Sequence, residues 1–290
     1  MRTGIAVLMP AYNEERYISI ALKSLLYQTL RPSVILIGDN EATDNTPKKA
    51  YEILRDSDVE FRVIRVKRYP ELGKLNINNV YYVLTRVLKC IYGNDVDYVA
   101  TIEADTALEG RYFEKIVKIF EKDEKLCITG GLLYPLGLIR DPFPLTRVSV
   151  NLWGANRVYR ANCWLQLNEI VDLRMLPAWD TDHVLLALLL GYHVYPVPHA
   201  RSITLRSVNP FRGRAKGWVD AMHGLPIWWA LYKTVEYRDI NYLRGYVESL
   251  VKVPYNNVNP YLFKIKEIYR SASYSVMLKK INSIFSVFKP

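Results

Sequence analysis

Short apolar runs alternate with amphipathic stretches through the first 130 residues. Between the first two runs, and again between the third and the fourth, apolar side chains recur on one face of a helix. Continuous apolar strands separated by helices are typical of a mostly parallel sheet that helices cover on both faces. We therefore predict an α/β fold whose ligands bind at the carboxyl ends of the strands. The predicted strands are residues 5–9, 34–37, 61–66, 98–102 and 127–129.

The pattern loosens between residues 130 and 176, which contain glycine, proline and aromatic residues without a clear period. We expect mixed strands and loops in this segment. A helix is predicted to follow, beginning near Asp180 and ending at Gly191, a residue type that commonly ends helices.

Beyond Pro198 the chain becomes basic and aromatic, with helical spacing and a break at residues 254–260. The last stretch, residues 277–288, places its large apolar side chains on one helical face. These changes divide the chain into an α/β domain, residues 1–210, and a C-terminal helical appendage, residues 211–290.

The net charge of +10 arises in the last 90 residues, which hold 15 basic and 5 acidic side chains. A neutral body with a basic tail indicates an anionic partner for the tail. Aromatic rings mixed with cations suit a membrane interface and equally suit single-stranded nucleic acid. A helical cap whose aromatic side chains form its own core is the simpler alternative.

The three cysteines, Cys90, Cys127 and Cys163, are widely spaced and form no CxxC pair. This pattern predicts neither a zinc site nor a disulfide framework, so we interpret them as reduced core residues of a cytoplasmic protein. The apolar runs are too short for a signal peptide or a membrane span. Contact with the inner membrane face would then be peripheral, through the basic C-terminal region.

The first predicted strand runs directly into the loop Pro10-Ala11-Tyr12-Asn13-Glu14-Glu15. Tyrosine, asparagine and glutamate at a strand end can stack on and hydrogen-bond a flat, polar base. The alternative is an ordinary loop in which Asn13 caps the next helix.

The second predicted strand ends at Asp39, and polar residues 40–46 follow it. A carboxylate at this position suits the ring N–H of a nucleotide base. Thr43 and Asp44 are better interpreted as helix caps than as ligands.

Two carboxylates, Glu103 and Asp105, follow the apolar run of residues 98–102. Side chains two residues apart point the same way in an extended chain. Two hard oxygen ligands with open positions for phosphate suit Mg²⁺ or Mn²⁺. A solvated acidic loop is the alternative for this pair taken alone.

Taken together, these segments resemble the inverting family-2 glycosyltransferases, which have the GT-A fold, a Rossmann-like α/β architecture. Residues 10–15 match the family's opening loop, and residues 39–46 resemble its Asp-Asn-Gly-Ser-Thr-Asp-Asn-Thr segment. Residues 73–76 resemble the Gly-Lys stretch that opens the next helix, and residues 103–105 stand where the Asp-x-Asp metal motif is expected. The order and spacing match over roughly residues 4–200.

The resemblance implies a nucleotide-diphosphate-sugar donor held with Mg²⁺ or Mn²⁺. It implies that Asp39 binds the base and that Asp105 coordinates the metal. Glu103 replaces the commoner aspartate and is expected to reach the metal or the ribose. His199 stands where some relatives supply a third metal ligand, with a structural histidine as the alternative. The implied donor site comprises Pro10, Ala11, Tyr12, Glu14, Asp39, Lys74, Glu103, Ala104 and Asp105.

The resemblance also locates the catalytic base in the segment Trp179-Asp180-Thr181-Asp182-His183. We assign the base to Asp182, which would accept the proton of the acceptor as its oxygen attacks the anomeric carbon. Asp180 is the second candidate and the expected N-cap of the helix.

We therefore predict a hexosyltransferase that moves a sugar to a hydroxyl of a glycan or to a lipid-linked phosphate. Arginines after residue 200, including Arg206, could grip the donor diphosphate. One alternative is a sugar nucleotidyltransferase, which the acidic, glycine-free loop at residues 10–15 disfavours. Another is a nucleic-acid-binding or membrane-binding protein on an inactive GT-A fold, although no nucleic-acid recognition motif supports it. The sequence leaves the oligomeric state open.

Overall fold

The computed structural model divides the chain into two compact units, Met1–Val208 and Asn209–Pro290, which are described separately. Lys74, most of the expected break at 254–260 and the amphipathic stretch 277–288 lie outside the described residues. The described residues are 4–68, 75–92, 95–135, 152, 154–206, 213–252 and 260–271.

The first unit is built on a mixed sheet with nine described strands in the order β3-β2-β1-β4-β7-β6-β9-β5, with β8 pairing to β6. Strands β3, β2, β1 and β4 are parallel, and β7 is antiparallel to its neighbours β4 and β6. The strands are β1 Ile5–Ala11, β2 Val34–Asp39, β3 Glu60–Arg65, β4 Tyr98–Ile102, β5 Thr106–Leu108, β6 Leu126–Pro135, β7 Asn156–Arg160, β8 His193–Val194 and β9 Val197–Thr204.

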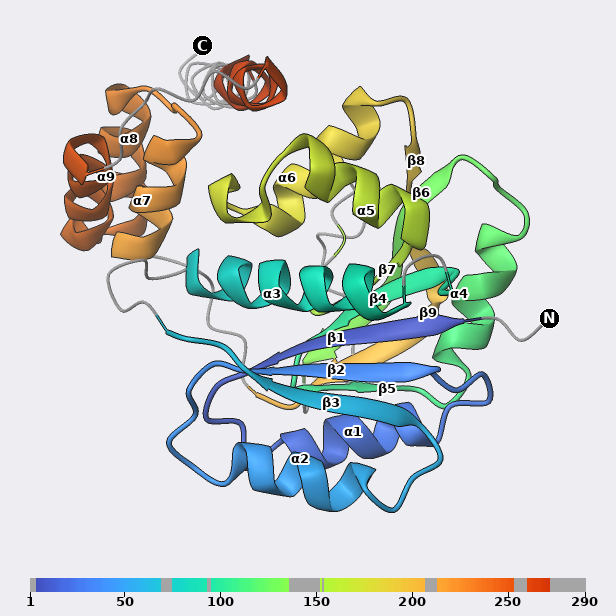
Figure 1. The fold of residues 1–290 in the computed structure, drawn as a ribbon. Coiled ribbons are helices and arrows are strands. Elements are labelled where there is room, and N and C mark those ends of the chain that lie inside the picture. Colours follow the sequence, from blue (N-terminus) through green and yellow to red (C-terminus); the bar gives the residue numbers. More distant parts are fainter. Residues whose placement is uncertain are drawn as a thin grey trace, which may run out of the picture. The chain divides into compact units, whose positions relative to one another are not determined.

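Helices lie on both faces of this sheet, as the sequence pattern predicts. Helices α1 and α2 lie on one side of the parallel strands, and α3, α5 and α6 lie on the other (Figure 1). The helices are α1 Ile18–Leu26, α2 Thr46–Leu54, α3 Leu75–Tyr92, α4 Tyr112–Phe120, α5 Ala161–Ile170 and α6 Trp179–Leu189, with a short 3₁₀ helix at Leu173–Met175.

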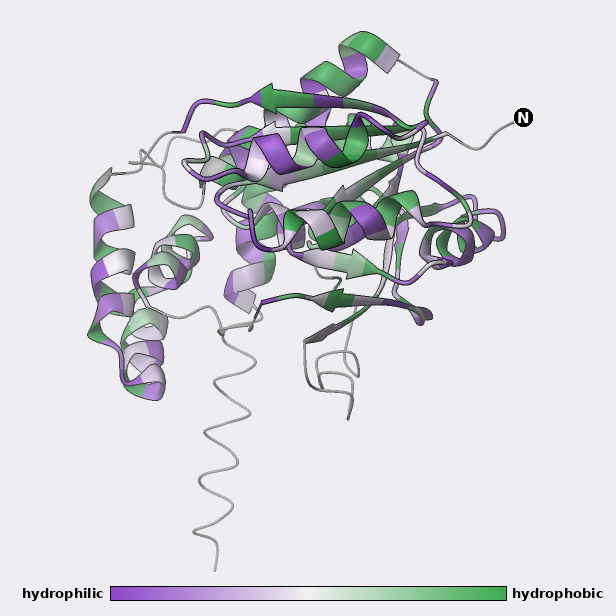
Figure 2. Cartoon of the chain, turned by 90° about the horizontal axis from the view of Figure 1, so that it is seen from below, coloured by the Kyte–Doolittle hydropathy of each residue, from purple (hydrophilic) through white to green (hydrophobic). Residues whose placement is uncertain are grey.

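The core explains why β1 and β2 read as continuous apolar runs. Ile5, Val7 and Met9 of β1 pack in one cluster with buried side chains of α1, α2 and α4. Ala6 and Leu8 point to the other face and are also fully buried. A strand with both faces covered needs apolar side chains at every position. Figure 2 shows the helices in both colours along their length, because each has a polar face as well as an apolar one.

Two elements lie where the sequence did not predict them. Helix α5 falls within residues 130–176, which we expected to be strands and loops, and it buries Trp164 and Leu167 against the sheet. Strand β9 begins at Val197 and continues past Pro198, after which we expected the helical tail. Its side chains mostly alternate between buried and exposed, so it lacks the continuous apolar run of β1, β2 and β4.

The expectation of three reduced core cysteines is wrong. Cys127 of β6 and Cys163 of α5 form a disulfide, with their Cα atoms 5.6 Å apart. Cys90 is the free cysteine among the described residues, and it is exposed rather than in the core. The separation of 36 residues between the bonded pair carries no local signal, so only the packing of α5 on the sheet brings the two together.

Gly131 marks an irregularity in β6. The register with β9 shifts between Gly131 and Leu132, and a Cβ atom at Gly131 would lie 2.3 Å from the carbonyl oxygen of Ala200. The glycine therefore allows two backbones to approach closely at a β-bulge.

The second unit is helical in its described residues. It contains α7 Arg214–Met222, α8 Ile227–Tyr237 and α9 Ile240–Lys252, and residues 260–271 are also helical. Ala221, Ala230, Tyr242 and Tyr246 form its core, so part of the aromatic content of the tail is buried. In the part of the chain that the structure describes, every helix is too short or too polar to span a membrane.

Candidate functional site

The loops that follow β1 and β2 are tied together by hydrogen bonds. The backbone N–H of Thr43 donates to Asn13 Oδ1 over 2.8 Å, and the N–H of Glu14 donates to Thr46 Oγ1 over 2.7 Å. Asp44 accepts the N–H of Glu15 over 3.0 Å. Asn13 therefore joins the two loops rather than capping α1. The result is a fixed rim at the carboxyl ends of both strands.

Two residues of this rim, Asn13 and Glu41, have left-handed backbone conformations with φ of 53° and 54°. Such conformations are uncommon outside glycine and cluster at functional sites. Asparagine tolerates this region well, whereas Glu41 is held there while its carboxylate accepts the N–H of Arg68 over 3.0 Å.

Asp39, the expected base-binding residue, ends β2 directly beside Ala11 of β1. Its Oδ1 atom accepts the N–H of Ala42 over 2.8 Å, and 6% of the residue is exposed. Tyr12 directly follows β1, and its ring centroid lies 3.8 Å from the guanidinium of Arg68. A carboxylate and an aromatic ring thus follow two neighbouring strands.

A cleft of about 580 Å³, including its open mouth, lies at the carboxyl ends of β1 and β4. Seven of the predicted donor-site residues line it, and Asn40 brings the end of β2 to the same cleft. Its lining is Pro10, Ala11, Tyr12, Glu14, Asn40, Ile77, Val80, Glu103, Ala104, Asp105 and Arg206.

The cleft holds more negative than positive charge. Burial, with the like charges of Asp105 and Asp180, raises the pKa of Glu103 to about 7. Burial also raises the pKa of Glu14, although Arg206 acts in the opposite direction. Closely spaced carboxylates disfavour one another's ionised forms, so a cation would be attracted to this site.

Arg206 brings a positive charge into this acidic cleft. Its Nε atom lies 2.9 Å from Asp105 Oδ2, and its Nη2 donates to both carboxylate oxygens of Glu14. The N–H of Leu205 donates to the carbonyl oxygen of Asp105 over 2.7 Å, which holds the arginine beside the acid. In the sequence, Arg206 is one of several basic residues after position 200. Only the pairing of β9 with β5 shows that it lies beside Asp105.

The two aspartates of α6 have different surroundings from those expected. Asp182 is fully buried, and its carboxylate accepts the backbone N–H of Ala178, the N-cap residue of the helix. Asp180 is half-buried and does not cap the helix. Its Oδ1 accepts the N–H of Thr181 over 2.9 Å.

Asp180 lies beside Gly154, close to the end of β4. A Cβ atom at Gly154 would lie 3.1 Å from Asp180 Cβ, and the adjacent Ala155 accepts the N–H of Glu103 over 3.1 Å. The negative charge of Asp180 contributes to the raised pKa of Glu103. Asp180 therefore shares the electrostatic environment of the cleft, whereas Asp182 faces the protein interior.

A buried polar layer supports α6, and the sequence did not reveal it. Arg157 of β7 is fully buried and donates hydrogen bonds to the carbonyl oxygens of Asp180 and Leu152. His183 is also fully buried, among the rings of aromatic neighbours. Burial, with the nearby charge of Arg157, lowers the pKa of His183 to about 3.

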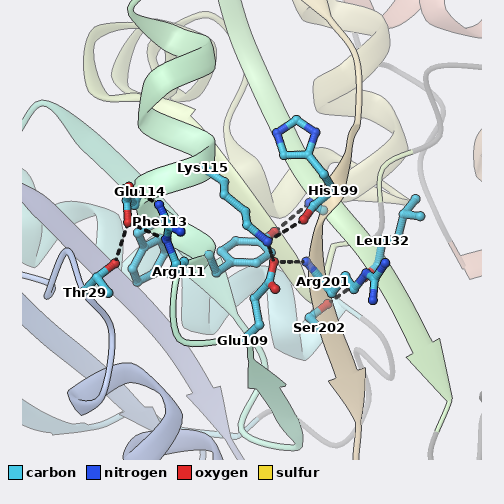
Figure 3. Close-up of polar contacts among 12 residues, drawn as sticks. Thr29, Glu109, Arg111, Phe113, Glu114, Lys115, Leu132, His199, Arg201 and Ser202 are labelled. Carbon is cyan, nitrogen blue, oxygen red and sulfur yellow. Dashed lines mark hydrogen bonds and ion pairs between the residues drawn. The ribbon is translucent and has the colours of Figure 1, made fainter.

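His199 is not brought to Asp105. Its backbone carbonyl accepts a hydrogen bond from Lys115 over 2.7 Å, beside the ion pair of Lys115 with Glu109, and its ring points away from that pair (Figure 3). Asp105 contacts Leu205, six residues further along the extended chain, a separation of roughly 15–20 Å. Among the described residues, no three His, Cys, Asp or Glu side chains are grouped to hold a metal.

The chain belongs to glycosyl transferase family 2, whose sequence profile matches residues 6–170. An uncharacterized glycosyltransferase of Haemophilus influenzae is 29% identical over 129 residues, which cover 44% of this chain and 36% of that protein. A poly-beta-1,6-N-acetyl-D-glucosamine synthase of Staphylococcus epidermidis is 28% identical over 129 residues, which cover 44% of this chain and 28% of that protein. The match thus spans about a third of the length of these relatives.

Solved structures show the same fold. The S. aureus protein TarS, residues 1–349, in complex with UDP, has a TM-score of 0.56 at 14% identity, covering 76% of this chain and 64% of that one. The mannosyltransferase PcManGT from Pyrobaculum calidifontis, in complex with GDP-Man and Mn2+, has a TM-score of 0.55 at 16% identity, covering 100% and 82%. The predicted GT-A architecture with C-terminal helices is confirmed.

Proposed function

We propose that this chain is an inverting glycosyltransferase that uses a nucleoside-diphosphate sugar as donor and a divalent cation. The observation that carries the proposal is the cleft in which Glu14, Glu103, Asp105 and Arg206 meet beside Asp39. Family membership supports sugar transfer as the reaction. Carboxylates and an arginine at one edge of a parallel sheet suit a ligand that carries a base, a diphosphate and a sugar.

The base of the donor is proposed to bind at Asp39 and Tyr12. Asp39 accepts the N–H of Ala42 through one oxygen, which leaves its second oxygen as an acceptor for a ring N–H of the base. The Tyr12 ring offers a stacking surface on which Arg68 already lies. Fixed loops around both residues would keep the site in shape before the donor arrives.

The residues at the end of β4 fit a hard divalent cation. Glu103 and Asp105 supply carboxylate oxygens, and Mg²⁺ is commonly held by one or two carboxylates together with substrate phosphates. The excess negative charge that raises the pKa of Glu103 is the kind of environment that such a cation relieves. When bound, the cation would supply neutralisation of the charge that develops on the departing diphosphate.

We assign the catalytic base to Asp180 rather than Asp182. Asp180 is half-buried beside Gly154, near Glu103, whereas the carboxylate of Asp182 is engaged by the N–H of Ala178 in the interior. Asp180 would accept the proton of the acceptor hydroxyl as the oxygen bonds to the anomeric carbon. The bond from that carbon to the diphosphate breaks with its electron pair, and attack from the opposite face inverts the configuration.

Arg157 is proposed to position Asp180. Its guanidinium donates to the carbonyl oxygen of Asp180 and to that of Leu152, so it joins the start of α6 to the segment beside β7. A buried guanidinium with several fixed donors is costly to remove, because its acceptors lose their partner. The base would therefore keep one orientation toward the acceptor.

An acceptor hydroxyl, rather than a lipid phosphate, is the acceptor class that a base at Asp180 favours. A phosphate is already ionised at neutral pH and needs little help from a base. A glycan or the sugar of a lipid-linked glycan would meet this requirement equally.

The proposal is tested by donor hydrolysis and transfer assays with Asp180→Asn and Asp182→Asn. UDP-linked and GDP-linked sugars are the first probes, because structural neighbours were solved with UDP and with GDP-Man. Asp180→Asn should bind the donor normally and lose transfer by at least about 100-fold, the usual contribution of a general base. Asp182→Asn should mainly lower the melting temperature. Normal transfer by Asp180→Asn would exclude it as the base.

A further inference from the structure

Arg206 joins two parts of the donor cleft that come from different strands. Glu14 belongs to the loop after β1, and Asp105 belongs to the turn between β4 and β5. The guanidinium contacts both carboxylates, through Nη2 to Glu14 and through Nε to Asp105 at 2.9 Å. The Tyr17 ring lies against the same guanidinium, 5.6 Å from it to the centroid. A planar group with several donors is suited to such a bridge, and a lysine is not.

This bridge uses the carboxylate that the proposed function needs for the cation. Asp105 Oδ2 accepts the charged hydrogen bond from Arg206, and 8% of Asp105 is exposed. A guanidinium and a divalent cation on one small carboxylate would repel each other, and this repulsion is weakly screened in a partly buried cleft. Of the described residues that line the cleft, Arg206 is the one with a positive charge.

The side chain of Arg206 also has room to leave its position. Its side chain is 47% exposed, whereas those of Glu14 and Asp105 are 14% and 11% exposed. The backbone beneath it is held, because Leu205 donates to the carbonyl oxygen of Asp105 over 2.7 Å. The guanidinium can therefore turn within the cleft while its Cα stays in place.

We propose that Arg206 occupies the cation's carboxylate in the free protein and exchanges with the cation when the donor binds. This inference rests on the proposed function. The incoming cation takes Asp105, and the released guanidinium turns to the diphosphate that arrives with it. Arg206 thereby opposes binding of the cation alone and favours binding of the cation together with the nucleotide.

The exchange predicts opposite effects of one substitution on two ligands. Arg206→Ala removes the competitor for Asp105, so Mn²⁺ alone should bind at least about 10-fold more tightly than to the wild type. The same substitution removes a charged partner of the diphosphate, so UDP or GDP at saturating Mn²⁺ should bind at least about 10-fold more weakly. A residue with a merely structural role would weaken both ligands together.

The experiment is a titration of the protein with Mn²⁺. Binding is measured by calorimetry and by the electron paramagnetic resonance signal of free Mn²⁺. It compares the wild type with Arg206→Ala, Arg206→Lys and Asp105→Asn. Arg206→Lys keeps the charge without the bridge and should lie between wild type and Arg206→Ala. Arg201→Ala, which removes an exposed arginine of β9 five residues before Arg206, is the matched control and should change neither affinity. Melting curves report whether each variant is folded.

The outcomes separate this inference from the proposed function. If Asp105→Asn abolishes Mn²⁺ binding while Arg206→Ala and Arg206→Lys leave it unchanged or weaker, the exchange is refuted and the metal site stands. If the wild type binds neither Mn²⁺ nor any nucleotide, both are refuted. Tighter Mn²⁺ binding with weaker nucleotide binding in Arg206→Ala supports the exchange.

Discussion

The buried His183 gives the fold a pH dependence whose size follows from its surroundings. The ring lies edge-on to Tyr159, Trp164 and Trp179, with centroids 5.3 to 5.9 Å away, and no part of the residue is exposed. Burial, the larger cause, and the charge of Arg157 lower its pKa from 6.5 to about 3. The neutral ring is therefore favoured in the folded protein.

The sign follows from proton binding. Above pH 6.5 the ring is neutral in both the folded and the unfolded protein, so its full contribution to stability is present. Below pH 6.5 the unfolded chain binds a proton that the folded protein does not bind until about pH 3. Each pH unit in this window costs about 1.4 kcal/mol of unfolding free energy, and the whole window costs about 5 kcal/mol.

His183→Phe isolates this effect, because phenylalanine keeps an aromatic ring among the same neighbours and cannot be protonated. Overpacking by the larger ring costs about 1–3 kcal/mol, and this cost is independent of pH. Urea unfolding between pH 7.5 and 4.5, followed by tryptophan fluorescence with EDTA present, measures the slopes. The wild type should lose about 2–3 kcal/mol more than the variant across this range. Parallel stability curves would refute the reasoning, and His199→Ala at an exposed site serves as control.

Three further predictions follow from the site and the core. Glu103→Gln should stabilise the metal-free protein by up to about 3 kcal/mol at pH 8 and leave its stability unchanged near pH 4.5. The reason is that folding raises the pKa of Glu103 from 4.5 to about 7, so the cost of ionising Glu103 in the folded protein grows between these two values. Urea unfolding in EDTA should show the stability curves of the wild type and the variant converge at low pH. Replacing both Cys127 and Cys163 with serine should lower the unfolding free energy by about 3–4 kcal/mol, as expected for a disulfide between residues 36 positions apart. Equal stability of the variant and the non-reduced wild type would contradict this. Asp39→Asn should weaken nucleoside-diphosphate binding at least about 10-fold in calorimetry without changing Mn²⁺ affinity, because it removes a charged acceptor but no metal ligand. Equal nucleotide affinity of the variant and the wild type would exclude Asp39 as the base-binding residue.

Strands β1, β2 and β4 of the parallel half could be predicted from the sequence because they are buried on both faces. Residues 5–9 and 34–37 are continuous apolar runs, and each ends where polar residues must begin. The carboxyl ends of parallel strands meet at one edge, so the order of the motifs predicted which side chains share a cleft. This reasoning predicted that Tyr12, Asp39 and Asp105 lie near one another, but it could not predict the distances between them.

The contributions of the later elements could not be predicted in the same way. Strand β9 mostly alternates buried and exposed residues, so nothing in its pattern indicated that Arg206, two residues beyond its end, would meet Asp105. Likewise, Asp180 and Asp182 stand two residues apart near the start of one helix, where successive side chains point about 100° apart. Which of them is buried depends on where the helix begins, and in the structure the N–H of Ala178 engages the buried Asp182.

The central claim is that the cleft beside β1, β2 and β4 binds a nucleoside diphosphate together with a divalent cation. Melting curves of the wild type with UDP, GDP, ADP, CDP or dTDP, each with and without Mn²⁺, test it most directly. The account predicts that one base raises the melting temperature, only with Mn²⁺ present, and that Asp105→Asn removes the shift. No shift with any of the five nucleotides, with Mn²⁺ or with Mg²⁺, would contradict it.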